Sequence, residues 1–243
     1  MAENRASEYS EYTEGTPCWV DAQLPDLEAG KRFYGELFGW AFEEQPTGTV
    51  RALKDRDPVA SLAHKTDGRL PTVWTVSFST PDADALCARI RAADGRVIAP
   101  PAPFGDLGRT ALVTDPEGAV FSLWQPGTAT GFARRHEPGT FAWVQLYTRD
   151  TGTANTFYGD LFQDALFGEG ADPEFGRAPV SEVFAPEMPP HLLVHFAVTE
   201  LEPALERVAR LGGRTQVPPF ETSYGTAAVV TDNQGASFAL LRR

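Results

Sequence analysis

A six-residue phrase occurs twice in this chain of 243 residues and constrains its fold more than any other feature. It reads Phe-Tyr-Gly-Glu-Leu-Phe at 33–38 and Phe-Tyr-Gly-Asp-Leu-Phe at 157–162, and each copy follows a strand-like run beginning Gly-Thr. A second phrase, Asp-x-x-Gly, stands at 115–118 and again at 232–235, just before the last apolar run of each half. Because both phrases return in the same order, the sequence predicts a tandem duplication.

Alternating apolar residues between turn residues predict a similar order of elements in both halves. In the first half we expect strands at 18–23, 49–54, 59–63, 73–79, 110–114 and 119–124, and helices at 26–38 and 82–93. In the second half we expect strands at 142–147, 192–198, 226–231 and 236–241, and helices at 153–162 and 202–211. The predicted fold class is α+β, with two tandem βαβββ modules that pair to form a shared cavity.

Composition along the chain suggests four segments. Residues 1–13 are polar and predict a flexible leader, 14–126 a first module, 127–138 a linker and 139–243 a second module. The stretch 167–190 is rich in Gly and Pro, so its structure is left open, with a lid as one option.

Charge and composition limit the partners. The formal net charge is -12, and no basic stripe suited to a phosphate backbone is present. No apolar run approaches the roughly 20 residues of a membrane helix, and the N-terminus lacks the pattern of a signal peptide. We therefore expect a cytoplasmic protein without nucleic-acid or membrane partners, either monomer or homodimer. The negative charge favours a cationic ligand or simply serves solubility.

Strand alternation places a mixed aromatic and polar set of side chains on the face opposite the helices. Because such a set is too aromatic for free exposure and too polar for a plain core, it predicts either a small-molecule pocket or a face buried against the sister module or a second subunit. The candidate ligand-binding residues are Trp19, Asp21, Gln23, Ser77, Ser122, Trp124, Trp143, Gln145, Tyr147 and His195.

The repeated unit, the helix phrase Phe-Tyr-Gly-Glu-Leu-Phe-Gly-Trp and the closing phrase Asp-Pro-Glu-Gly-Ala-Val-Phe-Ser-Leu-Trp resemble the vicinal oxygen chelate superfamily. This superfamily includes glyoxalase I, extradiol dioxygenases, fosfomycin-resistance enzymes and bleomycin-resistance proteins. The resemblance implies the fold but not the activity, since metalloenzymes and pure binding proteins share this scaffold.

The resemblance also implies where a metal would bind. In the metalloenzymes, a first-strand His and a last-strand Glu hold a divalent cation, and these positions fall on Trp19 and Trp143 and on Ser122 and Ala239. None of these is a suitable ligand, so we expect no metal and no cofactor. His195 matches a strand that supplies a His ligand in extradiol dioxygenases; the alternatives are a metal ligand, a hydrogen-bonded interior histidine, and a ligand-contacting or acid–base group.

These observations favour a metal-independent binding protein for a bulky, planar aromatic and amine-bearing small molecule, such as an antibiotic-like secondary metabolite, acting in self-resistance or in support of biosynthesis. Indole rings stack on planar rings and hold cations, and Asp21 would pair with an amine. We expect no catalytic residue under this hypothesis. The alternatives are a metal-free lyase, isomerase or hydroxylase-like enzyme that uses His195 or Asp21 as a base, and a metalloenzyme with displaced ligands.

Overall fold

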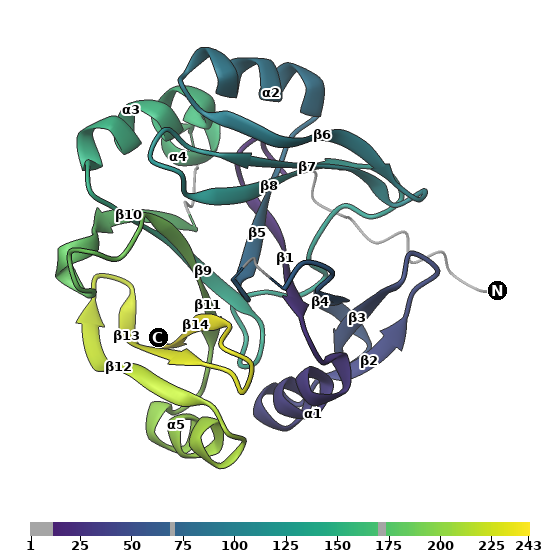
Figure 1. Cartoon of the computed structure of the whole chain (residues 1–243), viewed down its shortest axis with the longest axis vertical. Coiled ribbons are helices and arrows are strands. Elements are labelled where there is room, and N and C mark those ends of the chain that lie inside the picture. Colours follow the sequence, from purple (N-terminus) through teal and green to yellow (C-terminus); the bar gives the residue numbers. More distant parts are fainter. Residues whose placement is uncertain (1–11, 69–70, 170–173) are drawn as a thin grey trace.

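A computed structural model describes residues 12–68, 71–169 and 174–243, which form two curled β-sheets, one in each half of the chain (Figure 1). The first sheet has the strand order β2 (Ala41–Glu44), β3 (Thr49–Lys54), β4 (Asp57–His64), β1 (Pro17–Leu24), β5 (Trp74–Ser79), β8 (Val120–Pro126), β7 (Gly108–Thr114) and β6 (Arg96–Phe104). The second has the order β10 (Phe175–Pro179), β9 (Phe141–Thr148), β11 (His191–Ala197), β14 (Ser237–Arg242), β13 (Gly225–Thr231) and β12 (Arg214–Thr222).

The helices pack on the faces of the sheets that look toward the other half. They are α1 (Leu27–Phe38), α2 (Ala83–Ala92), α3 (Thr151–Leu161), α4 (Gln163–Phe167) and α5 (Leu201–Arg210), with a short 3-10 helix at Val180–Glu182. The carboxylates of Asp26, Asp82 and Asp150 accept hydrogen bonds from first-turn amides and so fix where α1, α2 and α3 begin. Figure 1 shows α1 beside α5 at one end of the molecule and α2 beside α3 at the other.

The α+β fold of two tandem modules is confirmed, and each module contains the strand–helix–strands unit twice. In the first half the units are β1-α1-β2-β3-β4 and β5-α2-β6-β7-β8. In the second half β11-α5-β12-β13-β14 is complete, whereas the unit that begins with β9 and α3 retains only β10 as its second strand. The Gly- and Pro-rich stretch after α3, for which a lid was one option, therefore supplies an edge strand of the second sheet.

Four edge strands, β2, β6, β10 and β12, were not expected from the sequence, and the two longest of them, β6 and β12, share one feature. Each carries a proline pair, Pro100-Pro101 in β6 and Pro218-Pro219 in β12, and proline removes a backbone donor. Edge strands tolerate this loss, because one side of the strand needs no partner. The register of both strands also shifts along their inner neighbours, as at a β-bulge.

An aromatic core fills the space between the two sheets. Phe196 of β11 contacts Phe38 and Trp74 of the first half, both at 5.0 Å between ring centroids. At the other end, Phe78 of β5 stacks on Phe162 at 5.0 Å. These rings belong to one buried cluster that spans both halves. The inner faces of the two sheets therefore meet through this cluster.

Two buried hydrogen bonds connect the repeated phrases across the halves. The Tyr34 hydroxyl in α1 donates to Asp232 Oδ2 at 2.8 Å, and the Tyr158 hydroxyl in α3 donates to Asp115 Oδ2 at 3.2 Å. All four side chains are at most 3% exposed. The tyrosine of each Phe-Tyr-Gly phrase thus donates to the first residue of the Asp-x-x-Gly phrase in the other half.

The same aspartates organise their own turns. Asp232 Oδ1 accepts from the backbone amides of Gln234 and Ala236, both at 2.8 Å, and Asp115 Oδ1 accepts from the corresponding amides at 3.0 and 2.8 Å. Burial raises the pKa of Tyr34 and of Tyr158 well above the ordinary value, so both hydroxyls remain donors at neutral pH. Each aspartate therefore couples a tight turn to a helix of the opposite half.

Two arginines add a second reciprocal contact at the helix ends. Arg89 of α2 donates to the carbonyl of Leu161 at the end of α3 at 2.7 Å, and Arg207 of α5 donates to the carbonyl of Leu37 near the end of α1 at 3.2 Å. Carbonyls in the last turn of a helix have no partner within the helix, and cations there are stabilising.

The leader and the linker meet on the first module. Residues 1–11 lie outside the described residues, and the Tyr12 hydroxyl donates to the carbonyl of Phe132 at 3.2 Å. The amide of Phe132 in turn donates to the carbonyl of Cys18 in β1 at 2.9 Å. Cys18 and Cys87 are free thiols.

We predict that Tyr34→Phe and Tyr158→Phe each lower the free energy of unfolding by about 1–3 kcal/mol, because each removes a donor from a buried carboxylate. Urea unfolding followed by tryptophan fluorescence would measure the change. Tyr147→Phe is the matched control, because its hydroxyl forms no hydrogen bond within the part of the chain that the structure describes. Losses no larger than that of the control would contradict a role for these bonds in holding the halves together.

Candidate functional site

The predicted site residues lie on the outer faces of two different sheets, that is, on the faces turned away from the shared core. Trp19, Asp21 and Gln23 of β1, Ser77 of β5, and Ser122 and Trp124 of β8 belong to the first sheet. Trp143, Gln145 and Tyr147 of β9 and His195 of β11 belong to the second. The structure therefore brings these residues together as two groups rather than one.

The outer face of the second sheet contains a pocket of about 600 Å³. It is lined by residues of the second half: Trp143, Gln145, Tyr147, Gly176, Arg177, Ala178, Glu182, Val183, Phe220, Glu221, Thr222, Ser223 and Tyr224. Three of the predicted residues thus form one wall, and the 3-10 helix and the β12–β13 hairpin form the others. A volume of this size suits a small organic ligand.

Two stacked aromatic rings form one wall of the pocket. The Trp143 indole and the Tyr224 ring lie 4.5 Å apart between centroids, with an angle of 22° between their planes. Gln145 Oε1 accepts from both of them, at 3.0 Å from Trp143 Nε1 and at 3.2 Å from the Tyr224 hydroxyl. This shared acceptor fixes the orientation of both rings.

Gly176 of β10 allows this arrangement. A Cβ atom at Gly176 would lie 2.3 Å from Gln145 Oε1 and 2.9 Å from the Trp143 ring, so no larger residue fits without moving them. The close approach of β10 to β9 therefore depends on glycine at this position.

Tyr147 closes the inner end of the pocket among other rings. Its ring contacts Phe184 edge-on at 4.9 Å and His191 at 5.6 Å. Burial raises the pKa of Tyr147 above its ordinary value, and nearby Tyr224 and Glu182 add to the shift. Burial likewise raises the pKa of Tyr224 to about 12, again with a contribution from Glu182. Both phenols are therefore neutral donors at physiological pH.

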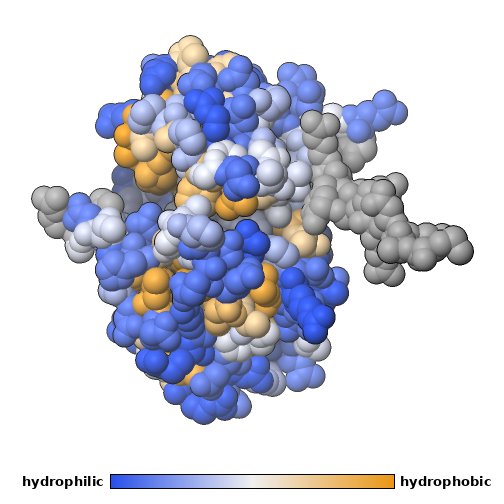
Figure 2. Space-filling view, turned by 90° about the vertical axis from the view of Figure 1, so that its right-hand side faces the viewer, coloured by the Kyte–Doolittle hydropathy of each residue, from blue (hydrophilic) through white to orange (hydrophobic). Residues whose placement is uncertain are grey.

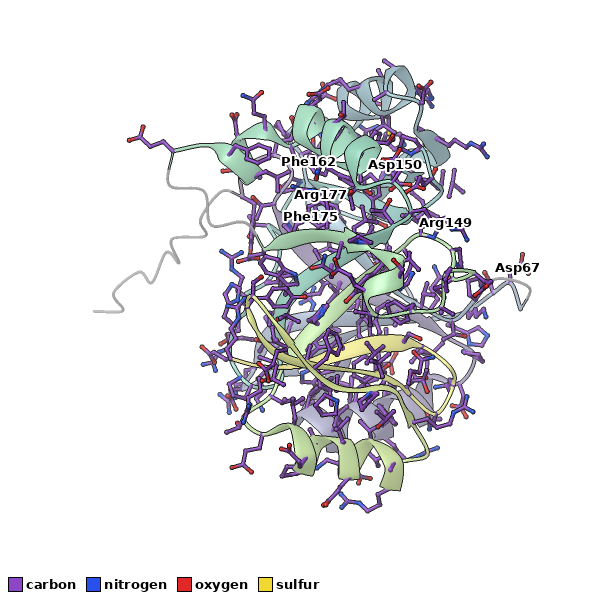
Figure 3. All side chains as sticks on the ribbon, turned by 90° about the vertical axis from the view of Figure 1, so that its left-hand side faces the viewer. Asp67, Arg149, Asp150, Phe162, Phe175 and Arg177 are labelled. Atoms are coloured by element: carbon purple, nitrogen blue, oxygen red, sulfur yellow. The ribbon has the colours of Figure 1, made fainter. Side chains whose placement is uncertain are left out.

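The charged groups around the pocket are mostly acidic. Glu182 and Glu221 are exposed residues of the lining. Arg177 Nε instead donates to Asn155 Oδ1 of α3 at 2.6 Å, and its guanidinium lies over the Phe175 ring, so this cation is directed toward α3 (Figure 3). The accessible charge around the opening thus favours a cation over an anion.

His195 is fully buried beside the pocket. Its Nδ1 lies 3.1 Å from the carbonyl of Leu193, and its ring meets the Tyr224 ring edge-on at 5.8 Å. Burial lowers the pKa of His195 to about 4, so the imidazole is neutral at pH 7 and donates from Nδ1. Its Nε2 has no hydrogen-bond partner among the described residues.

The donors around His195 do not form a metal site. In the strand register, His195 stands between Trp143 of β9 and Ala239 of β14, and neither an indole nor a methyl group coordinates a metal ion. No group of three or more His, Cys, Asp or Glu side chains that could hold a metal ion occurs in the described ranges. The residues present therefore do not fit the metal that the resemblance implies for enzymes of this fold.

The outer face of the first sheet has a different character. Asp21 lies between Ser61 of β4 and Thr75 of β5 in the strand register, and Trp19 Nε1 donates to Ser61 Oγ at 3.1 Å. Ser77 and Ser122 are neighbours in the next row. Figure 2 shows this side of the molecule, which is mostly hydrophilic with small hydrophobic patches.

The remaining predicted residues of the first half lie at the border of this face. Gln23 is exposed near the end of β1. Trp124 Nε1 donates to the carbonyl of Ala129 at 2.9 Å, and its ring lies against Phe104, so this indole secures the start of the linker.

Several lining residues escaped the sequence analysis, above all Phe220 and Tyr224. Both belong to the β12–β13 hairpin, and no strand was predicted for β12, which contains a proline pair. A usable signal was Gly225, since a short stretch that contains glycine between two strand-like runs often marks a hairpin turn.

One further structural finding concerns the helices. Within the described ranges, none has the length and apolar character that crossing a lipid bilayer requires.

Comparisons with known proteins give a consistent picture. The chain is 32% identical over 252 residues to a putative glyoxylase, CFP32, of Mycobacterium tuberculosis, covering 96% of this chain and 97% of that protein. It is 33% identical over 258 residues to the anthracycline biosynthesis protein DnrV of Streptomyces peucetius, covering 95% of this chain and 94% of that protein.

Solved structures with low sequence identity share the fold. The Mn(II)-bound glyoxalase from Novosphingobium aromaticivorans matches with a TM-score of 0.65 at 16% identity, over 95% of this chain and 83% of that chain. The 2,3-dioxygenase LapB from Pseudomonas sp. KL28 matches with a TM-score of 0.62 at 14% identity, over 95% and 93%. The family model for the glyoxalase/bleomycin resistance protein/dioxygenase superfamily matches residues 19–123. With these relatives matched along almost their whole length, the chain belongs to the glyoxalase/bleomycin resistance protein/dioxygenase superfamily.

Proposed function

We propose that this protein binds a planar aromatic, amine-bearing small molecule of secondary metabolism in the pocket of its second half, without a metal. The observation that carries the proposal is the stacked pair of Trp143 and Tyr224 on the wall of a pocket of about 600 Å³. The role that fits is sequestration of the molecule, or its delivery during biosynthesis.

The aromatic walls supply most of the expected affinity. Trp143, Tyr224, Tyr147 and Phe220 surround the pocket with flat apolar surface. Aromatic pairs contribute about 0.5–1.5 kcal/mol beyond the burial of their area. Gln145 and Gly176 keep the rings in place before a ligand arrives, which reduces the entropy lost on binding.

Charge would add selectivity rather than affinity. Glu182 and Glu221 are exposed, and exposed ion pairs contribute only about 0.2–1 kcal/mol. The net charge of -12 would also steer a cationic ligand toward the protein. A ligand amine would therefore improve recognition without dominating it.

The relatives support the class of ligand. Two Streptomyces proteins, DnrV and DauV, are named anthracycline biosynthesis proteins and are 33% and 32% identical to this chain over nearly its whole length. Anthracyclines combine a flat aromatic ring system with an amino sugar, which matches an aromatic pocket with an acidic rim. Partners other than a small molecule are not required by this proposal.

A second candidate function, metal-free catalysis, is supported by one observation. Nε2 of His195 is buried and unpartnered in the described part of the chain, and the low pKa of His195 leaves this nitrogen unprotonated at neutral pH, although it also makes it a weak base. His195 borders the pocket through Tyr224 but is not part of its lining. Binding alone therefore remains the better supported function.

We predict that Trp143→Leu weakens binding of an amino-sugar anthracycline at least tenfold, about 1.4 kcal/mol, because it removes the stacking surface. Isothermal titration calorimetry would measure the affinity. Trp124→Phe, which changes an indole of the first half, is the control and should bind like the wild type. Unchanged affinity of Trp143→Leu would exclude this pocket as the site.

We predict that Glu182→Gln weakens binding of the same anthracycline about two- to fivefold and leaves its neutral aglycone unaffected, because only the amine interacts with the carboxylate. The loss should shrink at high salt, which screens exposed charges. An equal loss for both compounds would indicate that Glu182 acts through the shape of the pocket.

We predict that the wild-type protein returns the bound anthracycline chemically unchanged after prolonged incubation, as judged by chromatography, and that His195→Ala binds it within twofold of the wild type. Conversion by the wild type that disappears in His195→Ala, with binding retained, would instead establish the catalytic alternative.

A further inference from the structure

The first half contains a carboxyl group without a protein partner at the centre of its sheet. Asp21 lies in β1, between β4 and β5, and its side chain is on the outer face. No hydrogen bond or ion pair to its carboxyl group is present among residues 12–68, 71–169 and 174–243. Asp21 is only partly buried, so its carboxyl group is accessible to a ligand.

No cation among the described residues neutralises the carboxyl group of Asp21. Burial raises the pKa of Asp21 to about 7. The nearest groups on β4 and β5 are Ser61 and Thr75, which carry no charge. The charged residues in the same row are Arg51 of β3, one strand further away, and Glu43 of β2, which pair with each other at 3.8 Å.

The groups around Asp21 have the composition of a binding site. Trp19, two residues earlier on the same strand, is partly buried and held by its hydrogen bond to Ser61. Ser77 and Ser122 are buried in the next row, and their hydroxyls are not bonded to any described residue. An indole, free hydroxyls and an unpaired carboxyl group on one face favour a ligand that combines a ring with a hydrogen-bond donor.

We propose that the first half carries a second, independent binding site, in which the Asp21 carboxylate pairs with the ammonium group of a small organic cation whose apolar part lies against Trp19. The described residues supply no donor to this carboxyl group, so a ligand that replaces water there would supply the hydrogen bonds. An ammonium group fits best, since it both donates hydrogen bonds and neutralises the carboxylate. The site is separate from the pocket at Trp143, so it stands whether or not that pocket binds its proposed ligand.

Nuclear magnetic resonance tests this site directly on the full chain. The five tryptophan indoles each contain one N–H group, and Trp19→Phe and Trp143→Phe would assign the two relevant signals. The probe is 2-naphthylmethylammonium at pH 8, where Asp21 is mostly ionised, and the neutral analogue is 2-naphthalenemethanol. We expect the ammonium probe to shift the Trp19 signal in the wild type, and the neutral analogue to need at least tenfold higher concentration.

The variants separate the two sites. In Asp21→Asn the Trp19 response should weaken at least tenfold while any Trp143 response stays, and in Trp143→Leu the Trp19 response should stay. An equal Trp19 response in the wild type and in Asp21→Asn would overturn the proposal, as would the absence of any Trp19 response in the wild type. Loss of the Trp143 response alone would count against the second-half pocket only.

A ligand-free measurement gives a second readout. An acid whose pKa is about 7 when folded and about 3.8 when unfolded binds its proton more tightly in the folded chain, so stability falls as pH rises from about 4 to about 7. Asp21→Asn lacks this loss. Its Tm should therefore exceed that of the wild type at pH 8, by a margin that shrinks toward pH 4. A Tm below that of the wild type at pH 8 would show that the carboxylate is already stabilised, and would overturn the proposal.

Discussion

The two reciprocal hydrogen bonds from Tyr34 to Asp232 and from Tyr158 to Asp115 determine how the halves of this protein meet. Each bond joins the first helix of one half to the closing turn of the other, inside an aromatic core that excludes water. A carboxylate buried in such a core requires donors, and the two tyrosines supply them. The Phe-Tyr-Gly phrase of each half therefore contacts the Asp-x-x-Gly phrase of the other half, so the same contact occurs twice.

This contact has a consequence for function. Because the aromatic core lies between the inner faces of the sheets, the outer faces are the ones left open to ligands in the described part of the chain, and each half has its own. The second half covers its face with the 3-10 helix and the β12–β13 hairpin, which leaves an aromatic pocket with an acidic rim. The first half presents hydroxyl groups and the unpaired carboxyl group of Asp21. Duplication thus produced two chemically different surfaces rather than one enlarged site.

The elements and the faces of the strands could largely be predicted from the sequence, because they depend on residues that are close together along the chain. Alternation along β9 correctly assigned Trp143, Gln145 and Tyr147 to one face, because neighbouring side chains on a strand point in opposite directions. The partners of Tyr34 and Tyr158 could not be found this way, since they lie about 198 and 43 residues away and depend on packing. Alternation also shows which residues share a face, but not which faces of two sheets meet. The strand β12 was not predicted, and its proline pair is atypical of a strand. Phe220 in this strand and Tyr224 in the turn that follows were therefore missed.

We propose that a planar cationic ligand binds on the outer face of the second half, against Trp143 and Tyr224. A crystal structure of the complex with an amino-sugar anthracycline tests it most directly. We expect ring density packed on these two residues, with the amine near Glu182. Ligand density between the two halves, or a metal bridging His195 and the ligand, would contradict it.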